Sequence, residues 1–176
     1  MRIKLLLLLV LGLPSLLCGE NPRQAPPQAS ERIAREVRHQ VLMLPYYNVF
    51  DDLSYRVDGS KVTLFGSVTQ PVLKSDAEKA VKKVEGVTQV DNQIEILPLS
   101  PMDEGIRRAV YRAIFSKPGM EKYQLGAVPP IHIIVKNGNV RLVGVVDNDG
   151  DKNLAGISAN TVSGVFKVQN ELRVQK

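Results

Sequence analysis

The sequence predicts an α+β protein made of two tandem αββαβ domains, each a small three-stranded mixed sheet with two helices on one face. The first observation is a duplication. Residues 57–68 match residues 135–146 at a constant offset of 78 (135 − 57), and residues 86–96 match 164–174 at the same offset. The second observation is that each copy has two segments with helical spacing of apolar residues and three with strand-like alternation. So many matches at one offset indicate an internal repeat.

The elements of each copy follow from local patterns. Apolar residues of 33–44 recur every three or four positions, which predicts a helix, and alternating residues around Gly59 predict a hairpin. Ser100 followed by Pro101 is a helix start signal in the second copy. In the first copy we expect a helix over 33–44, strands over 53–57 and 62–64, a helix over 71–84 and a strand over 94–96. The equivalents in the second copy are 106–114, 131–135, 140–142, 149–162 and 172–174.

The N-terminus has the pattern of an export signal. Arg2 and Lys4 precede an apolar run over 5–17, which is shorter than the roughly 20 residues of a membrane-spanning helix. We therefore predict a signal peptide over 1–19. Cys18, the only cysteine, lies where a bacterial lipoprotein signal places its acylated cysteine. Lipidation of Cys18 and its removal with the signal both stay open.

The remaining chain divides into a linker and two domains. Residues 20–30 are polar and rich in proline, which predicts a flexible linker. The two copies then define domains over 31–98 and 102–176. The predicted export and the modest charge of the chain after the signal argue against nucleic acid as a partner. The oligomeric state is left open.

Each copy carries a glycine turn, an alternating strand motif, a glycine–valine pair and an asparagine. In the first copy these are Val57-x-Gly59, Val62-x-Leu64-x-Gly66-x-Val68, Gly86-Val87 and Asn92-x-Ile94. The motif glycines of both copies are Gly59, Gly66, Gly86, Gly138, Gly144 and Gly164. This set of motifs resembles the BON family, named for bacterial osmotic-stress and nodulation proteins. The resemblance covers residues 31–98 and 102–175.

The resemblance implies a location and a function. It implies an αββαβ fold in a periplasmic protein, attached to the outer membrane if Cys18 is acylated. It also implies binding to phospholipid surfaces in support of envelope integrity or osmotic stress tolerance. In double-BON lipoproteins of this kind, the first helix of the second domain is implicated in contacting anionic lipid. The alternative is a protein-interaction adaptor for another periplasmic or outer-membrane component, and a third hypothesis is a small-ion binder of the potassium type.

The basic excess lies in the second copy. Residues 31–98 carry nine Lys/Arg and ten Asp/Glu, whereas residues 102–176 carry eleven and seven. On a helical wheel centred on Ile106, arginine and aromatic side chains project away from the core stripe, a composition that suits an anionic lipid interface. The expected membrane-binding residues are Arg107, at the edge of the stripe, and Arg108, Tyr111, Arg112, Phe115, Lys117 and Lys122. Two alternatives stay open: Phe115 folds into the core or packs on the first copy, or the arginines are simply solvated.

Groups that could support catalysis or metal binding are few. His39 and His132 fall at outward positions of their elements, and both are expected at the surface. Residues 147–151 resemble a calcium loop only faintly, because position twelve is Ser158 where the loop has a glutamate. Those residues are better explained as a turn that caps a helix, and residues 51–52 as a solvated turn. We therefore expect no enzymatic activity, no metal ion and no cofactor.

Overall fold

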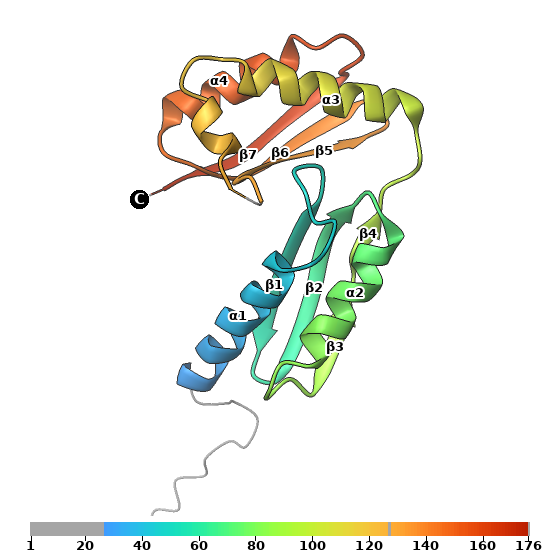
Figure 1. Cartoon of the computed structure of the whole chain (residues 1–176), viewed down its shortest axis with the longest axis vertical. Helices are drawn as coiled ribbons and strands as arrows, with labels where there is room; N and C mark the ends of the chain where they lie inside the picture. The colour runs from blue at the N-terminus through green and yellow to red at the C-terminus, as the bar shows by residue number, and fades with distance from the viewer. Residues whose placement is uncertain (1–26, 127, 176) are drawn as a thin grey trace, which may run out of the picture.

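The computed structural model describes residues 27–126 and 128–175, which form two α+β domains (Figure 1). The first domain contains α1 (Pro27–Leu42), β1 (Asp52–Asp58), β2 (Lys61–Val68), α2 (Pro71–Lys82), β3 (Gln89–Asn92) and β4 (Glu95–Ile96). The second contains α3 (Pro101–Phe115), the short 3-10 helix η1 (Glu121–Gln124), β5 (Ile131–Lys136), β6 (Asn139–Val146), α4 (Asp149–Asn160) and β7 (Lys167–Val174).

The N-terminal predictions fall mostly outside these residues. The predicted signal peptide over 1–19, including Cys18, lies outside the described residues, as does the predicted linker up to residue 26. α1 begins at Pro27, inside the segment expected to be linker. Proline is suited to the first turn of a helix, where its missing N–H would have no helical partner.

The two sheets have the same topology. β1 pairs antiparallel with β2, and β3 and β4 both pair parallel with β2 as one strand interrupted in the middle. In the second domain β5 pairs antiparallel with β6, and β6 pairs parallel with β7. Both helices of each domain cover one face of its sheet (Figure 1). The predicted fold class, two tandem αββαβ domains with mixed sheets, is confirmed.

The motif asparagine ties the last strand to the second helix in both domains. The Asn92 side-chain amide donates to the carbonyl of Lys74 at 2.8 Å, and that of Asn170 donates to the carbonyl of Lys152 at 2.7 Å. Donor and acceptor are both displaced by 78 residues between the copies. This repeated side-chain bond is a structural reason for the asparagine in the motif.

One motif glycine in each domain occupies a position closed to other residues. Gly66 and Gly144 have φ values of +118° and +125°. A Cβ atom would overlap the carbonyl oxygen of Asp52 in the first domain and of Pro130 in the second. Because only glycine adopts such a backbone without strain and leaves this space free, both strands require it.

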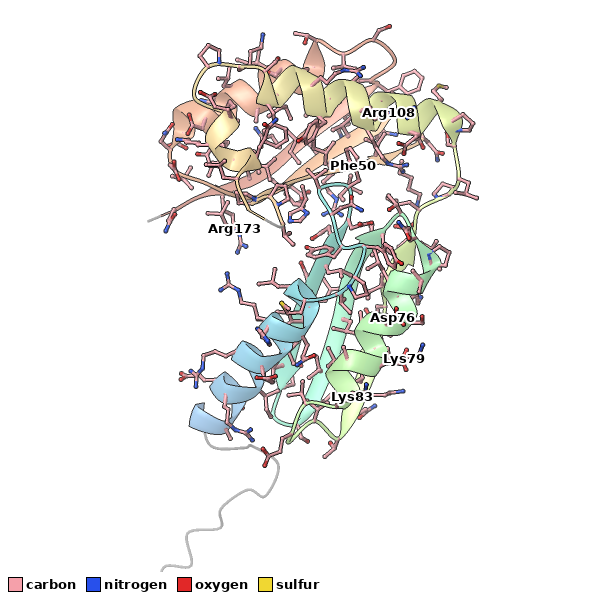
Figure 2. The ribbon with its side chains drawn as sticks, viewed as in Figure 1. Phe50, Asp76, Lys79, Lys83, Arg108 and Arg173 are labelled. Atoms are coloured by element: carbon pink, nitrogen blue, oxygen red, sulfur yellow. The ribbon has the colours of Figure 1, made fainter. Side chains whose placement is uncertain are left out.

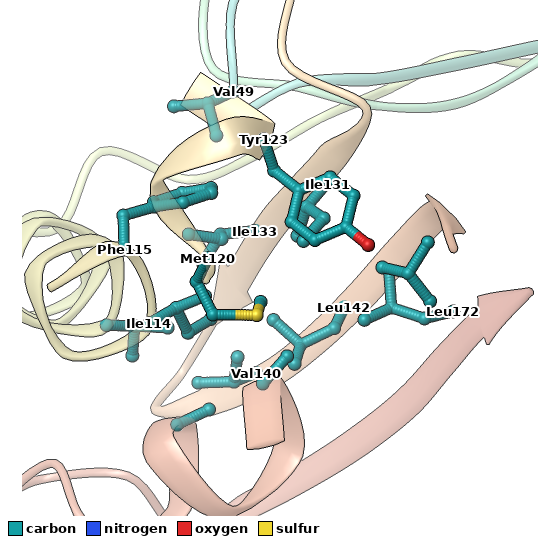
Figure 3. Close-up of a cluster of buried hydrophobic side chains, with 14 of the residues drawn as sticks. Val49, Ile114, Phe115, Met120, Tyr123, Ile131, Ile133, Val140, Leu142 and Leu172 are labelled. Carbon is teal, nitrogen blue, oxygen red and sulfur yellow. The ribbon is translucent and has the colours of Figure 1, made fainter. Parts of the chain in front are cut away.

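Each domain has its own apolar core between its helices and its sheet. α1 buries a stripe centred on Val37, at the spacing that the sequence predicts. The second core also includes Met120 and Tyr123, from the long connection between α3 and β5, together with Val49 of the first domain (Figure 3). The first domain thus completes the core of the second.

The loop between α1 and β1, residues 43–51, makes the apolar contact between the domains. The carbonyl of Val49 accepts a hydrogen bond from the N–H of Ile133 at 2.8 Å, and only 8% of the Val49 surface is exposed. The ring of Tyr47 stacks on His132 with 5.5 Å between centroids. This loop therefore anchors the first domain to the edge strand of the second sheet.

Two interdomain ion pairs accompany the contacts of that loop. Arg141 of β6 bonds to the Asp52 carboxylate at 3.1 Å and lies 3.6 Å from the Glu171 carboxylate. Lys136, at the end of β5, pairs with Glu95 of β4. The Lys136 and Glu95 side chains are about half exposed, whereas the Arg141–Asp52 pair is largely covered. The domains are therefore joined by apolar and ionic contacts together.

Candidate functional site

The candidate site is the outer face of α3, and the Arg107 side chain does not lie on that face. Arg107 is 4% exposed. Its guanidinium donates to the carbonyl of Val135 at 2.9 Å and pairs with Glu104 at 3.3 Å. A helical wheel placed Arg107 at the edge of the core stripe, but the side chain turns inward and ties α3 to β5. Its charge is therefore not available at the surface.

Phe115 was expected on the outer face, and that placement is wrong. Its side chain is 4% exposed and belongs to the core of the second domain, close to Met120 (Figure 3). Tyr111 packs on Phe115 with 4.7 Å between ring centroids, and Phe50 of the first domain meets Tyr111 edge-on at 6.2 Å. The reason is that the first-domain loop covers this side of α3. The aromatic residues thus form a contact between domains, one of the alternatives that the sequence left open.

Lys122 is engaged in a local ionic network. Its ammonium lies 2.6 Å from the Asp147 carboxylate and 2.9 Å from that of Asp151, and these carboxylates raise its pKa. The Tyr123 hydroxyl donates to Asp151 at 2.6 Å, and this bond, together with Lys122, lowers the pKa of the Asp151 carboxyl. Asn148 caps α4 by accepting from the backbone N–H of Asp151 at 2.8 Å. Asp147 and Asp151 are therefore held by Lys122, and Asp151 also by Tyr123, at the turn that caps α4.

Arg108, Arg112 and Lys117 remain exposed at the candidate site. The nearest carboxylate oxygen to the Arg108 guanidinium belongs to Glu104, at 3.9 Å. Arg112 and Lys117 form no ion pair with any residue in the described ranges. Arg108 and Arg112 line an open groove of about 500 Å³ between α3, the first-domain loop and the connection after η1. The groove therefore has two cationic side chains at its rim and aromatic rings in its wall.

Leu125 is a residue that sequence reasoning missed. It is 77% exposed, and its neighbours Gln124 and Gly126 line the same groove. The segment around it has no periodic pattern of apolar residues, so nothing in the sequence distinguished Leu125 from a core residue. An exposed leucine beside cationic side chains adds an apolar contact to the candidate site.

His132 and the paired aspartates occupy the domain boundary. His132 was expected at the surface, but its ring is covered by Tyr47, and this burial lowers its pKa. Asp51 is fully buried and accepts from the backbone N–H and the hydroxyl of Thr69 at 2.7 and 2.8 Å. Asp52 forms one of the two interdomain ion pairs described above, with Arg141. The expected solvated turn at these aspartates is therefore wrong, because both carboxylates have structural partners far along the chain.

Within residues 27–126 and 128–175, no cluster of three or more histidine, cysteine or acidic residues is placed to hold a metal ion. In the same ranges, no helix has the length and apolar character needed to cross a membrane. His39 is exposed on α1, as expected.

A tandem pair of αββαβ units, with a motif glycine and asparagine in each, defines the class of this protein. The BON domain model matches residues 29–98 and 103–176, and the chain therefore belongs to the BON domain family. It is 32% identical over 129 residues to osmotically-inducible protein Y of Escherichia coli (strain K12). That similarity covers 70% of this chain and 62% of the relative, so this chain spans less than two thirds of the relative's length.

Among solved structures, the chain is similar to CdsD, described as a structural protein of the type III secretion system of Chlamydia trachomatis. The sequence identity is 13%, and the similarity covers 81% of this chain and 92% of that one with a TM-score of 0.32. A second CdsD structure, of the C-terminal domain, has 14% identity and a TM-score of 0.28 over 81% of this chain and 96% of that one.

Proposed function

We propose that this BON protein docks on anionic phospholipid surfaces through the outer face of α3 in its second domain. The observation that supports this most directly is the pair Arg108 and Arg112, exposed one helical turn apart at the rim of the groove. Guanidinium groups bind phosphate oxygens in bidentate geometry and stay charged at every physiological pH. The docking residues in this proposal are Arg108, Arg112 and Lys117, with Leu125 as the apolar contact.

Docking in this proposal is electrostatic. Each cation close to an anionic membrane contributes about 1 kcal/mol. Tyr111 and Phe115 do not insert their rings into the lipid, since they are packed against each other and against the first domain. Arg107 and Lys122 act indirectly, by fixing α3 and the connection after it. The surface therefore attaches reversibly, and its binding weakens as salt screens the charges.

We further propose that the protein is exported, resides in the periplasm and supports the envelope during osmotic stress without enzymatic activity. The predicted signal peptide supports export, and the similarity to a protein named osmotically-inducible supports the role in osmotic stress. Attachment to the outer membrane through Cys18 stays part of this proposal. Labelling with a fatty-acid analogue tests it, because a Cys18→Ser variant would lose the label.

The docking proposal is tested by sedimentation with vesicles of phosphatidylcholine alone or mixed with phosphatidylglycerol. The wild-type protein should sediment only with the anionic vesicles. Arg108→Glu/Arg112→Glu should lose two contacts of about 1 kcal/mol each, which lowers the affinity about 30-fold or more. The same variant should remain folded, because both side chains project from the surface.

A matched control carries the same change of charge on a distant helix. Lys79→Glu/Lys83→Glu alters two exposed cations at the same spacing at the end of α2, in the first domain (Figure 2). It should bind anionic vesicles within about threefold of wild type, since a distant charge acts only through the screened field. Equal losses in both double variants would mean that net charge, and not the α3 face, governs binding.

A further inference from the structure

Within the described part of the chain, the outer edge of β1 in the first domain has hydrogen-bonding groups without a partner. Among these residues β1 pairs only with β2, so every second residue directs its N–H and carbonyl away from the sheet. The equivalent strand of the second domain identifies these residues. In β5, Ile133 lies opposite Leu142 and directs its N–H outward, to the carbonyl of Val49. In β1, Tyr55 lies opposite Leu64, and each of these two residues is 78 positions before its counterpart, so Tyr55 has the same place in the register. The backbone groups of Tyr55 therefore point outward, and no residue in the described ranges bonds to them.

This free edge opens into a cleft of about 1010 Å³ between the two domains. The first-domain wall includes Leu42 and Phe65, whose side chains are 44% and 37% exposed. The opposite wall is the face of the second sheet that carries no helices, where Val143 and Val145 contribute half-buried apolar side chains. The cleft thus combines an unpaired strand edge with apolar walls on both sides.

The cleft also carries positive charge from both domains. Arg141 in its wall is paired with the Asp52 and Glu171 carboxylates, so these three groups together carry one negative charge, which two further arginines exceed. Arg38 of α1 and Arg173 of β7 line the same cleft, and neither forms an ion pair with a residue in the described part of the chain. Figure 2 shows Arg173 projecting from the second domain toward the first. An occupant with carboxylate groups would complement these two arginines.

We propose that this cleft binds an extended polypeptide segment with acidic side chains, which adds to β1 as an outer strand. Strand addition takes its affinity from main-chain hydrogen bonds and its selectivity from contacts to alternate side chains. Tyr55 provides the main-chain groups, Phe65 and Val143 the apolar contacts, and the two arginines the preference for carboxylates. The site shares no lining residue with the groove beside α3, so this binding is separate from the proposed lipid docking.

The occupant is a single strand because the second domain stands opposite β1. A second folded copy of this chain would need to bring its own sheet and helices to the same edge, where the second domain already forms the other wall. A segment with no folded neighbour on either side avoids this steric conflict. Its length matches β1, which is seven residues long.

The test uses the full chain and two fluorescein-labelled peptides of seven residues, one alternating valine with glutamate and one alternating valine with lysine. Fluorescence anisotropy should show binding of the glutamate peptide at least about tenfold tighter than of the lysine peptide. Arg38→Glu/Arg173→Glu should reverse this preference. Arg108→Glu/Arg112→Glu, with the same change of charge at the proposed lipid site, should keep wild-type peptide affinity within about twofold.

Amide hydrogen exchange locates the bound strand. The amide of Tyr55 should exchange more slowly when the glutamate peptide is present, whereas the ladder amides shared with β2 should change little. Absence of binding up to about 1 mM peptide would overturn the proposal, as would protection confined to another strand. Equal affinity of wild type and the Arg38→Glu/Arg173→Glu variant would also overturn it. A peptide-induced dimer in sedimentation would mean that a second copy, and not the peptide alone, occupies the edge.

Discussion

Val49 offers the sharpest test of how the two domains depend on each other. Its side chain comes from the first domain but is buried in the core of the second. Val49→Ala removes two methyl groups, worth about 1.6 kcal/mol at roughly 0.8 kcal/mol each. The cavity left behind adds up to about 1 kcal/mol, so the expected cost is about 2 kcal/mol. The hydrogen bond from Ile133 to the Val49 carbonyl is unaffected, because it involves only the backbone.

Residue-resolved hydrogen exchange measures this cost separately in each domain. The most protected amides of β5 and β6 should lose about 2 kcal/mol of protection, because the second domain loses a core contact. Val72→Ala is the control: it makes the same chemical change on α2, where the side chain is 41% exposed, and should alter protection by less than about 0.5 kcal/mol. If Val49→Ala affected only the amides of β1 and β2, the assignment of Val49 to the second core would be refuted.

Three further predictions concern strain, pH and a polar network. In urea unfolding, Gly66→Ala should destabilise the first domain by at least about 2 kcal/mol, because of backbone strain and overlap with the Asp52 carbonyl. Gly105→Ala is the control: space is free at this position of α3, so the same measurement should show a neutral or stabilising effect. Because burial lowers the pKa of His132 below its unfolded value of about 6.5, the unfolded state binds more protons and stability should fall as the pH drops below that value. His132→Gln should reduce this fall in Tm between neutral and mildly acidic pH, and an unchanged fall would contradict the explanation. Tyr123→Phe should cost about 1.5 kcal/mol in urea unfolding, since it removes a hydrogen bond to a carboxylate; a loss below about 0.3 kcal/mol would show that the network adds little.

Local patterns predicted the elements well because they depend on residues close together in the chain. The stripe around Val37 and the alternation around Gly59 follow directly from helix and strand periods. The offset of 78 then made the second domain predictable from the first. The interruption between β3 and β4 was not predictable, since it depends on the pairing of both segments with β2.

The candidate site was predicted less completely because a helical wheel assumes a single buried direction. α3 faces its own sheet and also the loop that carries Phe50, so Phe115 and Tyr111 are covered from a second side. Arg107 turns inward to reach a backbone carbonyl 28 residues away. Lys122 finds its carboxylate partners more than twenty residues along the chain. Arg108 and Arg112 lie on the outer face, as the wheel predicted, and Lys117 is exposed just after the helix; none of the three has a long-range ionic partner within the described ranges.

The two interdomain ion pairs differ in burial, so salt should weaken one of them more than the other. The Debye length falls from about 8 Å at physiological ionic strength to about 3 Å at 1 M, which weakens exposed charge pairs first. Lys136 with Glu95 is half exposed, while Arg141 with Asp52 is more sheltered and the apolar contact of Val49 does not depend on screening. In concentrated salt we therefore expect the contact between the domains to weaken where Lys136 meets Glu95 and to persist at Val49. The stiffness of the connection between the two domains should then depend on the ionic strength around it.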